Sequence, residues 1–442
     1  MPNTVTAQDT RAQSNQASRP GTNSRVLVWL VIGLFFVWGG ATSLNDILIP
    51  KLKGLFQLSY AEVMLTQFAF FTAYFLVSLP AGTLVARVGY VRGLVIGLGV
   101  MVGGALLFWV AAGSGVYASF LVALFVLAAG ITILQVASNP LITTLGDPAG
   151  ASGRLTFAQA FNSLGTTVWP YIGALLILGT IGKTEPASLP PDQLGAFRAS
   201  QTTSIGHIYL GIGIVLAIIA AIFWTQRNVL PLVKEESVGF FDSVKLLRQP
   251  RVLFGTVALF VYVGAEVSIG SILANYLQLP STLHIDAQTA GERLSFYWGG
   301  AMVGRFIGSW LLNRVTPGTL LTGFAVMAAV LVLISMTTTD ALAGWSLIAV
   351  GLFNSIMFPT VFSLASEGQG SKTPQVSGLL CMAIVGGAIV PLITGTLADA
   401  TSIATALVVP VLCYAVIAAF GLAARKPLQA SSGATVASPA GE

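Results

Sequence analysis

The chain of 442 residues is 55% apolar and 8% charged, with a formal net charge of +5 at pH 7, whereas soluble globular chains carry about 25% charged residues. This composition excludes a cytosolic enzyme, a disordered protein and a nucleic-acid-binding protein, and it indicates a polytopic membrane protein. The two cysteines lie in apolar runs and only two histidines are present, so we expect no disulfide framework, no metal site and no cofactor.

Twelve segments are long and apolar enough to cross a bilayer as helices, which requires about 20 residues each. They cover residues 26–49, 60–86, 91–113, 116–145, 152–180, 205–226, 252–279, 294–314, 318–337, 342–366, 375–398 and 403–424. We therefore predict an all-α integral membrane protein with twelve transmembrane helices. Residues 1–25 and 425–442 are polar and are predicted to be disordered tails.

The positions of Lys and Arg predict the orientation of these helices. With twelve spans both termini share one side of the membrane, and fifteen of the 21 Lys and Arg residues fall on that side, against five on the other. The positive-inside rule then places both termini in the cytoplasm. We expect a multi-pass protein of a bacterial inner membrane.

The longest cytoplasmic loop, residues 227–251, divides the chain into an N-terminal bundle of six helices (26–226) and a C-terminal bundle of six (252–424). The two bundles show a weak repeat. The sequence GTLVAR at 82–87 matches SWLLNR at 309–314, Gln135 and Pro140 match Asn354 and Pro359, and Gly165 and Pro170 match Gly386 and Pro391. Two parallel six-helix repeats are typical of secondary transporters of the major facilitator type, whose substrate sits between the halves near the membrane midplane.

Among the charged residues, only Asp46, Glu266 and Arg305 lie clearly inside predicted spans. A charge at a helix centre costs about 2.5–3.5 kcal/mol on insertion scales, so such residues are functional-site candidates. A carboxyl group in a cavity can take up and release protons, as a proton-coupled transporter requires. We therefore predict that Asp46 and Glu266 couple transport to a cation, with structural pairing to Arg305 as the alternative. For Arg305 itself we predict a structural role.

Neutral polar side chains form a second set inside the spans. Gln135 and Asn139 share one face of the fourth span, and Gln159 and Asn162 share one face of the fifth. Amides donate and accept hydrogen bonds, as sugar hydroxyls do, and aromatic rings stack on apolar sugar faces. We predict that a neutral sugar contacts Gln135, Asn139, Gln159, Asn162, Asn275, Asn354, Tyr262 and Trp38. Interhelical hydrogen bonding is the alternative explanation of the amides.

Several motifs resemble those of the fucose permease family, the fucose–galactose–glucose:proton symporter branch of the major facilitator superfamily. They are WGGATSLNDILIP at 38–50, LTQFAFFTAYF at 65–75, LQVASNP at 134–140 and AQAFNSLGTT at 158–167. In the second half, YVGAEVSIG at 262–270 and YWGGAMVGR at 297–305 are similar to the glucose/galactose members. The resemblance covers essentially all twelve spans.

The resemblance implies a single-chain sugar symporter that works by alternating access. Asp46 matches the family's first-span acid, which is implicated in proton coupling. Gln135 matches a fourth-span residue implicated in sugar recognition, and Asn162 matches the family's fifth-span amide. Fucose permeases carry a carboxylate at the position of Gln135, so this chain lacks one titratable group, a departure that counts against fucose among the hexoses that fit the site.

The expected ligands are thus a neutral hexose such as glucose or galactose, or a related monosaccharide, and a coupling cation, with the lipid bilayer as surroundings. We expect import by proton symport, no binding of nucleic acid, no enzymatic activity and a monomeric carrier. Three alternatives stay open: sodium coupling, export of sugars or drugs by the same fold, and a receptor-like chain that does not transport. An integral membrane enzyme is disfavoured because no catalytic motif occurs.

Overall fold

The computed structural model describes residues 22–58, 60–173, 191–229 and 240–426, and in these ranges the chain is almost entirely helical. The first half contains α2 (Thr22–Phe56), α3 (Tyr60–Val88), α4 (Tyr90–Ser114), α5 (Tyr117–Thr144), α6 (Ala151–Gly173) and α7 (Pro191–Thr225). The second half contains α9 (Pro250–Gln278), α10 (Ala287–Leu311), α11 (Pro317–Thr337), α12 (Asp340–Asn354), α13 (Met357–Ser366), α14 (Thr373–Met382), α15 (Gly386–Ala400), α16 (Ile403–Ala406) and α17 (Val408–Ala423). Between them lies the short helix α8 (Phe240–Lys245).

Each of the twelve predicted spans overlaps at least one of these helices. In the described residues, ten helical segments are long and apolar enough to cross a membrane. The other two spans correspond to α6 and α10, which are more polar. The predicted tails differ in one detail, because α2 already begins at Thr22. Residues 1–21 and 427–442, and positions 174–180 of the fifth span, lie outside the described residues.

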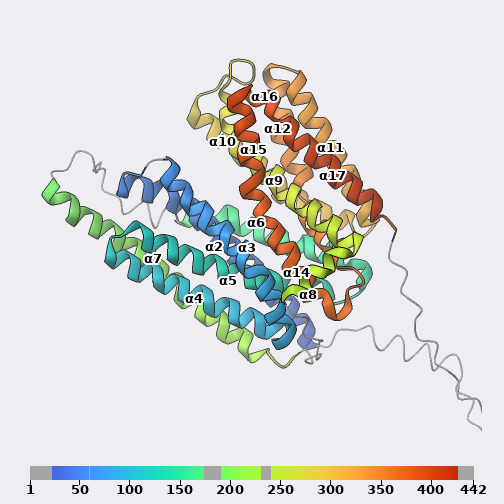
Figure 1. Ribbon diagram of the computed structural model, residues 1–442, viewed down its shortest axis with the longest axis horizontal. Helices are drawn as coiled ribbons and strands as arrows, with labels where there is room; N and C mark the ends of the chain where they lie inside the picture. The colour runs from blue at the N-terminus through green and yellow to red at the C-terminus, as the bar shows by residue number, and fades with distance from the viewer. Residues whose placement is uncertain (1–21, 59, 174–190, 230–239, 427–442) are drawn as a thin grey trace, which may run out of the picture.

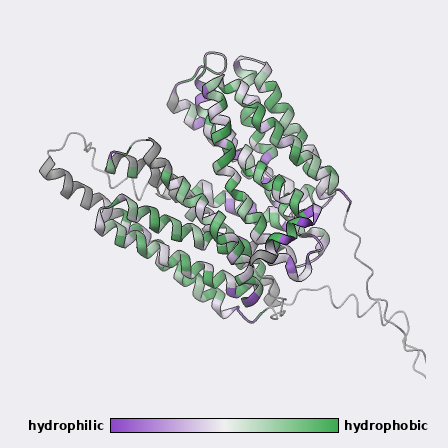
Figure 2. Cartoon of the chain, in the orientation of Figure 1, coloured by the Kyte–Doolittle hydropathy of each residue, from purple (hydrophilic) through white to green (hydrophobic). Residues whose placement is uncertain are grey.

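The helices consist mostly of hydrophobic residues (Figure 2), and many of these residues lie on the outside of the bundle, as lipid-facing helices require. Large hydrophobic side chains stand exposed along α4, α7 and α11, for example Val110, Ile218 and Val326, which are 57%, 56% and 48% exposed. Contiguous exposed apolar surface of this kind marks contact with a membrane rather than with water. Many small residues pack between the helices instead, which allows close backbone approach.

The helices fall into two groups that match the two halves of the sequence. In the first half, α4 packs against α5 and α7, α2 packs against α6, and α3 packs against α5. In the second half, α11 packs against α12 and α17, α10 packs against α12, and α9 packs against α15 and α17. The groups touch mainly where α14 meets α3 and α5, and where α6 meets α10 and α13. They converge at the end of the bundle that holds α8, called here the linker end, and spread apart toward the opposite end (Figure 1).

Two glycines bring α3 and α14 into backbone contact at the linker end. A Cβ atom on Gly82 would lie 2.8 Å from the Pro374 carbonyl oxygen, and one on Gly378 would lie 2.7 Å from the Ser78 carbonyl oxygen. Only glycine permits an approach this close. Hydrogen bonds add to the junction, because the Ser377 hydroxyl donates to the Val136 carbonyl at 2.8 Å.

A second contact between the halves lies on the other side of the linker end. The Ser309 hydroxyl of α10 donates to the Gly153 carbonyl of α6 at 2.9 Å, and the hydroxyls of Ser152 and Ser363 lie 2.9 Å apart. The two halves are therefore joined at the linker end by close backbone packing and neutral hydrogen bonds.

Candidate functional site at the middle of the bundle

A carboxylate, a tyrosine and an arginine meet near the middle of the second half. Glu266 lies about 24 Å along α9 from its first residue, and the Tyr262 hydroxyl one turn earlier donates to its Oε1 at 2.8 Å. The Arg305 guanidinium on α10 approaches the same oxygen at 3.9 Å. The Glu266 and Arg305 side chains are 13% and 14% exposed. The structure thus brings the predicted Glu266 and Tyr262 together and gives Arg305 an electrostatic role beside them.

The tenth predicted span is broken next to this group. The helix α12 ends at Asn354, and α13 begins only at Met357. A broken helix leaves backbone carbonyls without intrahelical partners, and the Ser355 carbonyl accepts instead from Arg305 Nε at 3.2 Å. Discontinuous helices near mid-depth form substrate and ion sites in many transporters.

Asn354, the last residue of α12, connects two buried tyrosines. Its Nδ2 donates to the Tyr297 hydroxyl at 2.8 Å, and its Oδ1 accepts from the Tyr414 hydroxyl at 2.8 Å. The Tyr297 hydroxyl in turn donates to the backbone carbonyl of Glu266 at 3.1 Å. The polar network therefore runs without interruption from α17 through the break to α9.

The eleventh span is also interrupted, between α14 and α15. Residues Ala383–Val385 form a single turn of 3-10 helix, and this turn contacts both α9 and α3. Gly386 follows it and admits no side chain, because a Cβ atom there would clash with the Phe260 carbonyl. Both interruptions therefore flank α9, the helix that carries Glu266.

In the first half, two pairs of polar side chains lie between buried helices. Gln135 of α5 donates to the Tyr74 hydroxyl of α3, and Gln159 of α6 donates to Asn139 Oδ1 of α5 at 3.4 Å. The Asn139 Nδ2 atom is buried and has no hydrogen-bond partner in the described residues. An unpaired buried donor is costly, so Asn139 is available to a ligand or an ordered water.

Asn162 and Trp38 belong to the packing of α6 against α2. Asn162 Nδ2 donates to the Phe35 carbonyl at 3.1 Å, and the Trp38 ring lies 4.6 Å from the Phe35 ring. Gly39 makes this contact possible, because a Cβ atom there would meet Asn162. The Asn162 Nδ2 donor therefore makes an interhelical hydrogen bond, which is the alternative to sugar binding stated above for the amides.

Two predicted site residues remain, Asp46 and Asn275. Asp46 lies in α2, but its side chain is outside the part of the chain that the structure describes. Asn275 lies nine residues beyond Glu266 on α9, a rotation of half a turn, so it faces away from the network and is exposed. The predicted contribution of Asn275 to the site is not supported by this placement.

Sequence reasoning missed three tyrosines that complete the two polar groups, namely Tyr74, Tyr297 and Tyr414. All are almost fully buried, and buried tyrosine hydroxyls need a hydrogen-bond partner. The available signal was their location in otherwise apolar spans, since Tyr74 and Tyr297 fall in the family-like motifs at 65–75 and 297–305.

Comparison with known proteins places this architecture in a family. The Major Facilitator Superfamily profile matches residues 30–383. The chain is 49% identical over 395 residues to the glucose/galactose transporter of Brucella abortus, covering 89% of this chain and 92% of the relative. It is 34% identical over 406 residues to the L-fucose-proton symporter of Escherichia coli, covering 88% and 91% of the two chains.

The solved structure of FucP in the outward conformation superposes with a TM-score of 0.85 at 32% identity, covering 92% of this chain and all of that one. The chain therefore belongs to the Major Facilitator Superfamily and, within it, to the fucose permease family. It is more similar to the named glucose/galactose transporter than to the named fucose symporter, as the motifs of the second half predicted.

Proposed function

We propose that this protein imports a neutral hexose, such as glucose or galactose, together with a proton. The observation that carries the proposal is the continuous polar network from Tyr414 to Glu266 at the break of the tenth span. Ionisable residues inside membrane spans, here Glu266 and Arg305, mark substrate and ion pathways by default. The names of the relatives, a glucose/galactose transporter and a fucose-proton symporter, support a sugar as that ligand.

The chemistry of the two polar groups suits a polyhydroxylated, uncharged substrate. Amides and tyrosine hydroxyls both donate and accept hydrogen bonds, and they dominate on both sides: Gln135, Asn139 and Gln159 in the first half, Asn354 in the second. Arg305 is the cation that lies beside the network, and it already faces Glu266. An anionic substrate would need a cation that is free to bind it.

The surroundings of Glu266 favour a proton over sodium as the coupling cation. Its Oε1 accepts from the Tyr262 hydroxyl and faces the Arg305 guanidinium, both of which are hydrogen-bond donors. A sodium ion would need several oxygen acceptors in place of these donors. We assign proton coupling to Glu266 together with Asp46, the acid that the family resemblance points to.

The transport cycle follows from this assignment. The described halves meet at the linker end, so the state seen here corresponds to a carrier open at the opposite end. Protonation of the acids neutralises the site and favours sugar binding, after which the halves exchange their contacts and open at the linker end. A ligand drives this change only through its different affinity for the two states, so the fully loaded and the empty carrier must switch more readily than the half-loaded one.

The remaining features are proposed on the same basis. The positive-inside distribution places the linker end and both termini in the cytoplasm of a bacterial inner membrane. We take residues 26–226 and 252–424 as the two six-helix units, 227–251 as their linker, and a monomer as the functional carrier. Residues 230–239 of the linker lie outside the described residues.

Counterflow in proteoliposomes tests the proposal directly. Vesicles loaded with unlabelled glucose or galactose should take up labelled sugar, faster at low external pH and equally with or without sodium. Gln135→Ala should reduce this uptake at least tenfold, whereas Gln278→Ala, at the far end of α9, should leave it unchanged. Absence of counterflow with any hexose in correctly folded protein would exclude the sugar, and dependence on sodium at fixed pH would exclude the proton.

Direction of transport is a separate question, because an exporter shares this fold. In vesicles of known orientation, an inward proton gradient should drive accumulation of sugar. Accumulation driven only by an outward gradient of protons would favour the export alternative.

A further inference from the structure

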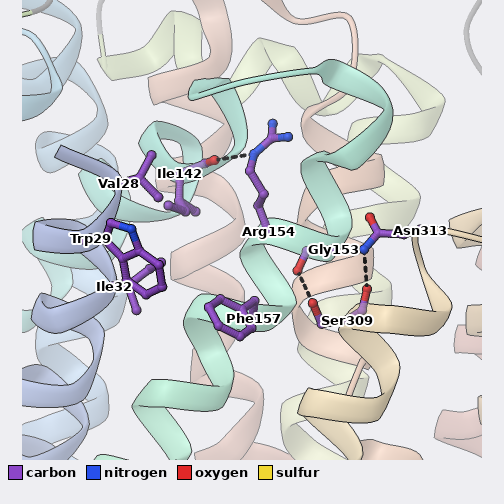
Figure 3. Close-up of a pocket in the computed structure, with 9 residues that line it drawn as sticks. All are labelled: Val28, Trp29, Ile32, Ile142, Gly153, Arg154, Phe157, Ser309 and Asn313. Carbon is purple, nitrogen blue, oxygen red and sulfur yellow. Dashed lines mark hydrogen bonds between the residues drawn. The ribbon is translucent and has the colours of Figure 1, made fainter. Parts of the chain in front are cut away.

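A pocket of about 270 Å³ lies at the linker end, away from the polar network (Figure 3). Its walls come from both halves of the protein, since α2, α5 and α6 form one side and α10 forms the other. The lining residues are Val28, Trp29, Ile32, Ile142, Gly153, Arg154, Phe157, Ser309 and Asn313.

The directions of the helices show which of these residues lie near the linker end and which lie deeper in the bundle. The helix α6 begins at the linker end, so Arg154 lies at the rim and Phe157 lies one turn farther into the bundle. In α2 the same order places Val28 before Ile32. The helix α10 runs the opposite way and ends at the rim, next to Asn313. The pocket therefore has a polar rim at the end of the bundle and an apolar interior.

Arg154 leaves a positive charge at this rim. Its guanidinium donates to the carbonyls of Ile142, Thr143 and Asp147, at 3.3, 2.7 and 2.7 Å. These bonds hold the side chain against the end of α5, and none of them is to a carboxylate. Among the described residues no carboxylate lies within ion-pair distance of Arg154, although the Asp147 side chain is near enough to act on the guanidinium electrostatically.

Two exposed tryptophans mark the level of the pocket relative to the membrane. Trp29 lines the pocket and is 63% exposed, and Trp310, beside Ser309 on α10, is 52% exposed. Exposed tryptophans gather where the acyl region of a bilayer meets the headgroups. The Arg314 guanidinium lies 4.1 Å from the Trp310 ring centre, which adds a second cation at the same level.

We propose that this pocket binds an anionic phospholipid of the cytoplasmic leaflet, with one acyl chain along Ile32 and Phe157 and the phosphate beside Arg154. The arrangement of the pocket supports a lipid as the ligand. Arg154 lies at the cytoplasmic rim and the apolar residues lie deeper, and a phospholipid of the cytoplasmic leaflet likewise has its charged headgroup toward the cytoplasm and its acyl chains toward the membrane centre. The proposal rests on the orientation given under Proposed function, and it does not depend on which solute is transported.

Bound lipid would stabilise the closed linker end. The pocket exists only while α6 and α10 are held together, as they are by the hydrogen bond from Ser309 to Gly153. A ligand that binds one state of a protein raises the population of that state. Anionic lipid should therefore favour the state seen here over a state open at the linker end.

Native mass spectrometry of the full-length protein, titrated with phosphatidylglycerol or with phosphatidylcholine of the same acyl chains, tests the proposal. The wild type should bind one phosphatidylglycerol about fivefold more tightly than phosphatidylcholine, the preference expected for one arginine near an anionic headgroup. Val28→Trp should fill the pocket and abolish this binding. Val122→Trp, at an exposed position of α5 outside the pocket, should bind as the wild type does.

Three results would contradict the proposal. If the wild type binds the two lipids with equal affinity, the pocket does not recognise the anionic headgroup. Undiminished phosphatidylglycerol binding by Val28→Trp would place the lipid elsewhere. The third is an Arg154→Gln variant that still prefers phosphatidylglycerol over phosphatidylcholine as the wild type does. The unfolding temperature of this variant checks that it is folded. If Val28→Trp does not fold, the headgroup comparison in the wild type and the Arg154→Gln result still decide the question.

Discussion

The Arg305 guanidinium lies 3.9 Å from Glu266 Oε1, and the same side chain donates through Nε to the Ser355 carbonyl at 3.2 Å. One arginine thus connects the acid of α9 with the broken backbone between α12 and α13. A change in the charge of Glu266 acts on Arg305 and, through it, on the ends of both helices. Arg305 is therefore both a structural partner of the helix break and an electrostatic partner of Glu266.

The first prediction concerns Glu266→Gln. The amide keeps an oxygen that can accept from Tyr262, but it cannot exchange a proton. We expect uphill accumulation driven by a proton gradient to fall to the equilibrium level, while counterflow continues. The measurement is sugar uptake with and without an imposed pH gradient, with Glu292→Gln, an exposed carboxylate of α10, as the control.

Asp46→Asn provides the comparison for this prediction. If Asp46 couples transport together with Glu266, both variants should lose accumulation and keep exchange. Uphill transport that survives in Glu266→Gln but not in Asp46→Asn would assign coupling to Asp46 alone.

The second prediction concerns the energetic coupling between Arg305 and Glu266. Arg305→Met leaves both the carboxylate and the Ser355 carbonyl without the guanidinium, so it should destabilise the protein. Adding Glu266→Gln removes the charge that the arginine balances, and the double variant should be less destabilised than the sum of the two single variants. The expected interaction energy is about 0.5–3 kcal/mol, measured from unfolding in the same detergent. Strictly additive losses would mean that the two charges do not interact.

The third prediction concerns Asn354→Leu, which keeps the number of side-chain heavy atoms and the branching but has no polar atoms. Tyr414 then loses its acceptor and Tyr297 loses its donor, at a cost of about 1–3 kcal/mol for each buried group left unpaired. We expect a lower unfolding temperature and at least tenfold weaker sugar binding. Tyr414→Phe removes only one of these bonds and should show a smaller loss of stability. An Asn354→Leu protein with wild-type sugar affinity would exclude Asn354 from the site.

The fourth prediction concerns the close contact between α3 and α14. Gly82→Ala places a methyl group 2.8 Å from the Pro374 carbonyl oxygen, so the two helices must separate, and overpacking of this kind costs about 1–3 kcal/mol. Cys381 of α14 is fully buried and serves as a native reporter. In a Cys413→Ser background, Gly82→Ala should react faster with a maleimide at Cys381.

Gly99→Ala is the matched control for this experiment, because a Cβ atom at Gly99 meets no other atom within 4 Å. It should leave the labelling rate of Cys381 unchanged. Equal rates in Gly82→Ala and Gly99→Ala would show that the glycine contact does not keep the linker end closed.

Hydropathy alone was sufficient to locate the helices, because a bilayer-spanning helix must be apolar over about 20 residues. The same averaging conceals the two breaks. Residues Ser355 and Ile356, and the turn at Ala383–Val385, lie inside segments of high mean hydropathy. Pro359 is a local signal for the first break, because it has no N–H to donate to the Ser355 carbonyl four residues earlier. The turn at Ala383–Val385 depends on contacts between distant helices, since a side chain on Gly386 would clash with the Phe260 carbonyl of α9.

The site was predicted in part for a similar reason. Charge and amide content identify Glu266, Gln135 and Asn354, because these groups are unfavourable in lipid without partners. Their partners Tyr297 and Tyr414 are amphipathic residues common in apolar spans, so their roles depend on contacts between distant helices. Asn275 was predicted from its polarity alone, and helix geometry places it on the opposite face of α9 from Glu266, so its part in the site stays a prediction.

The two helix breaks have a mechanical consequence for the linker end. Beyond them, α13 and α14 continue as separate helices of ten residues each, about 15 Å long, and these segments carry contacts to the other half. A short rigid rod pivoting at one end amplifies motion: a turn of roughly 10° displaces its far tip by about 2.6 Å. We expect a small rearrangement around Arg305 and Ser355 to shift α13 against α6 by a distance of this order, which would loosen one of the two contacts between the halves at the linker end.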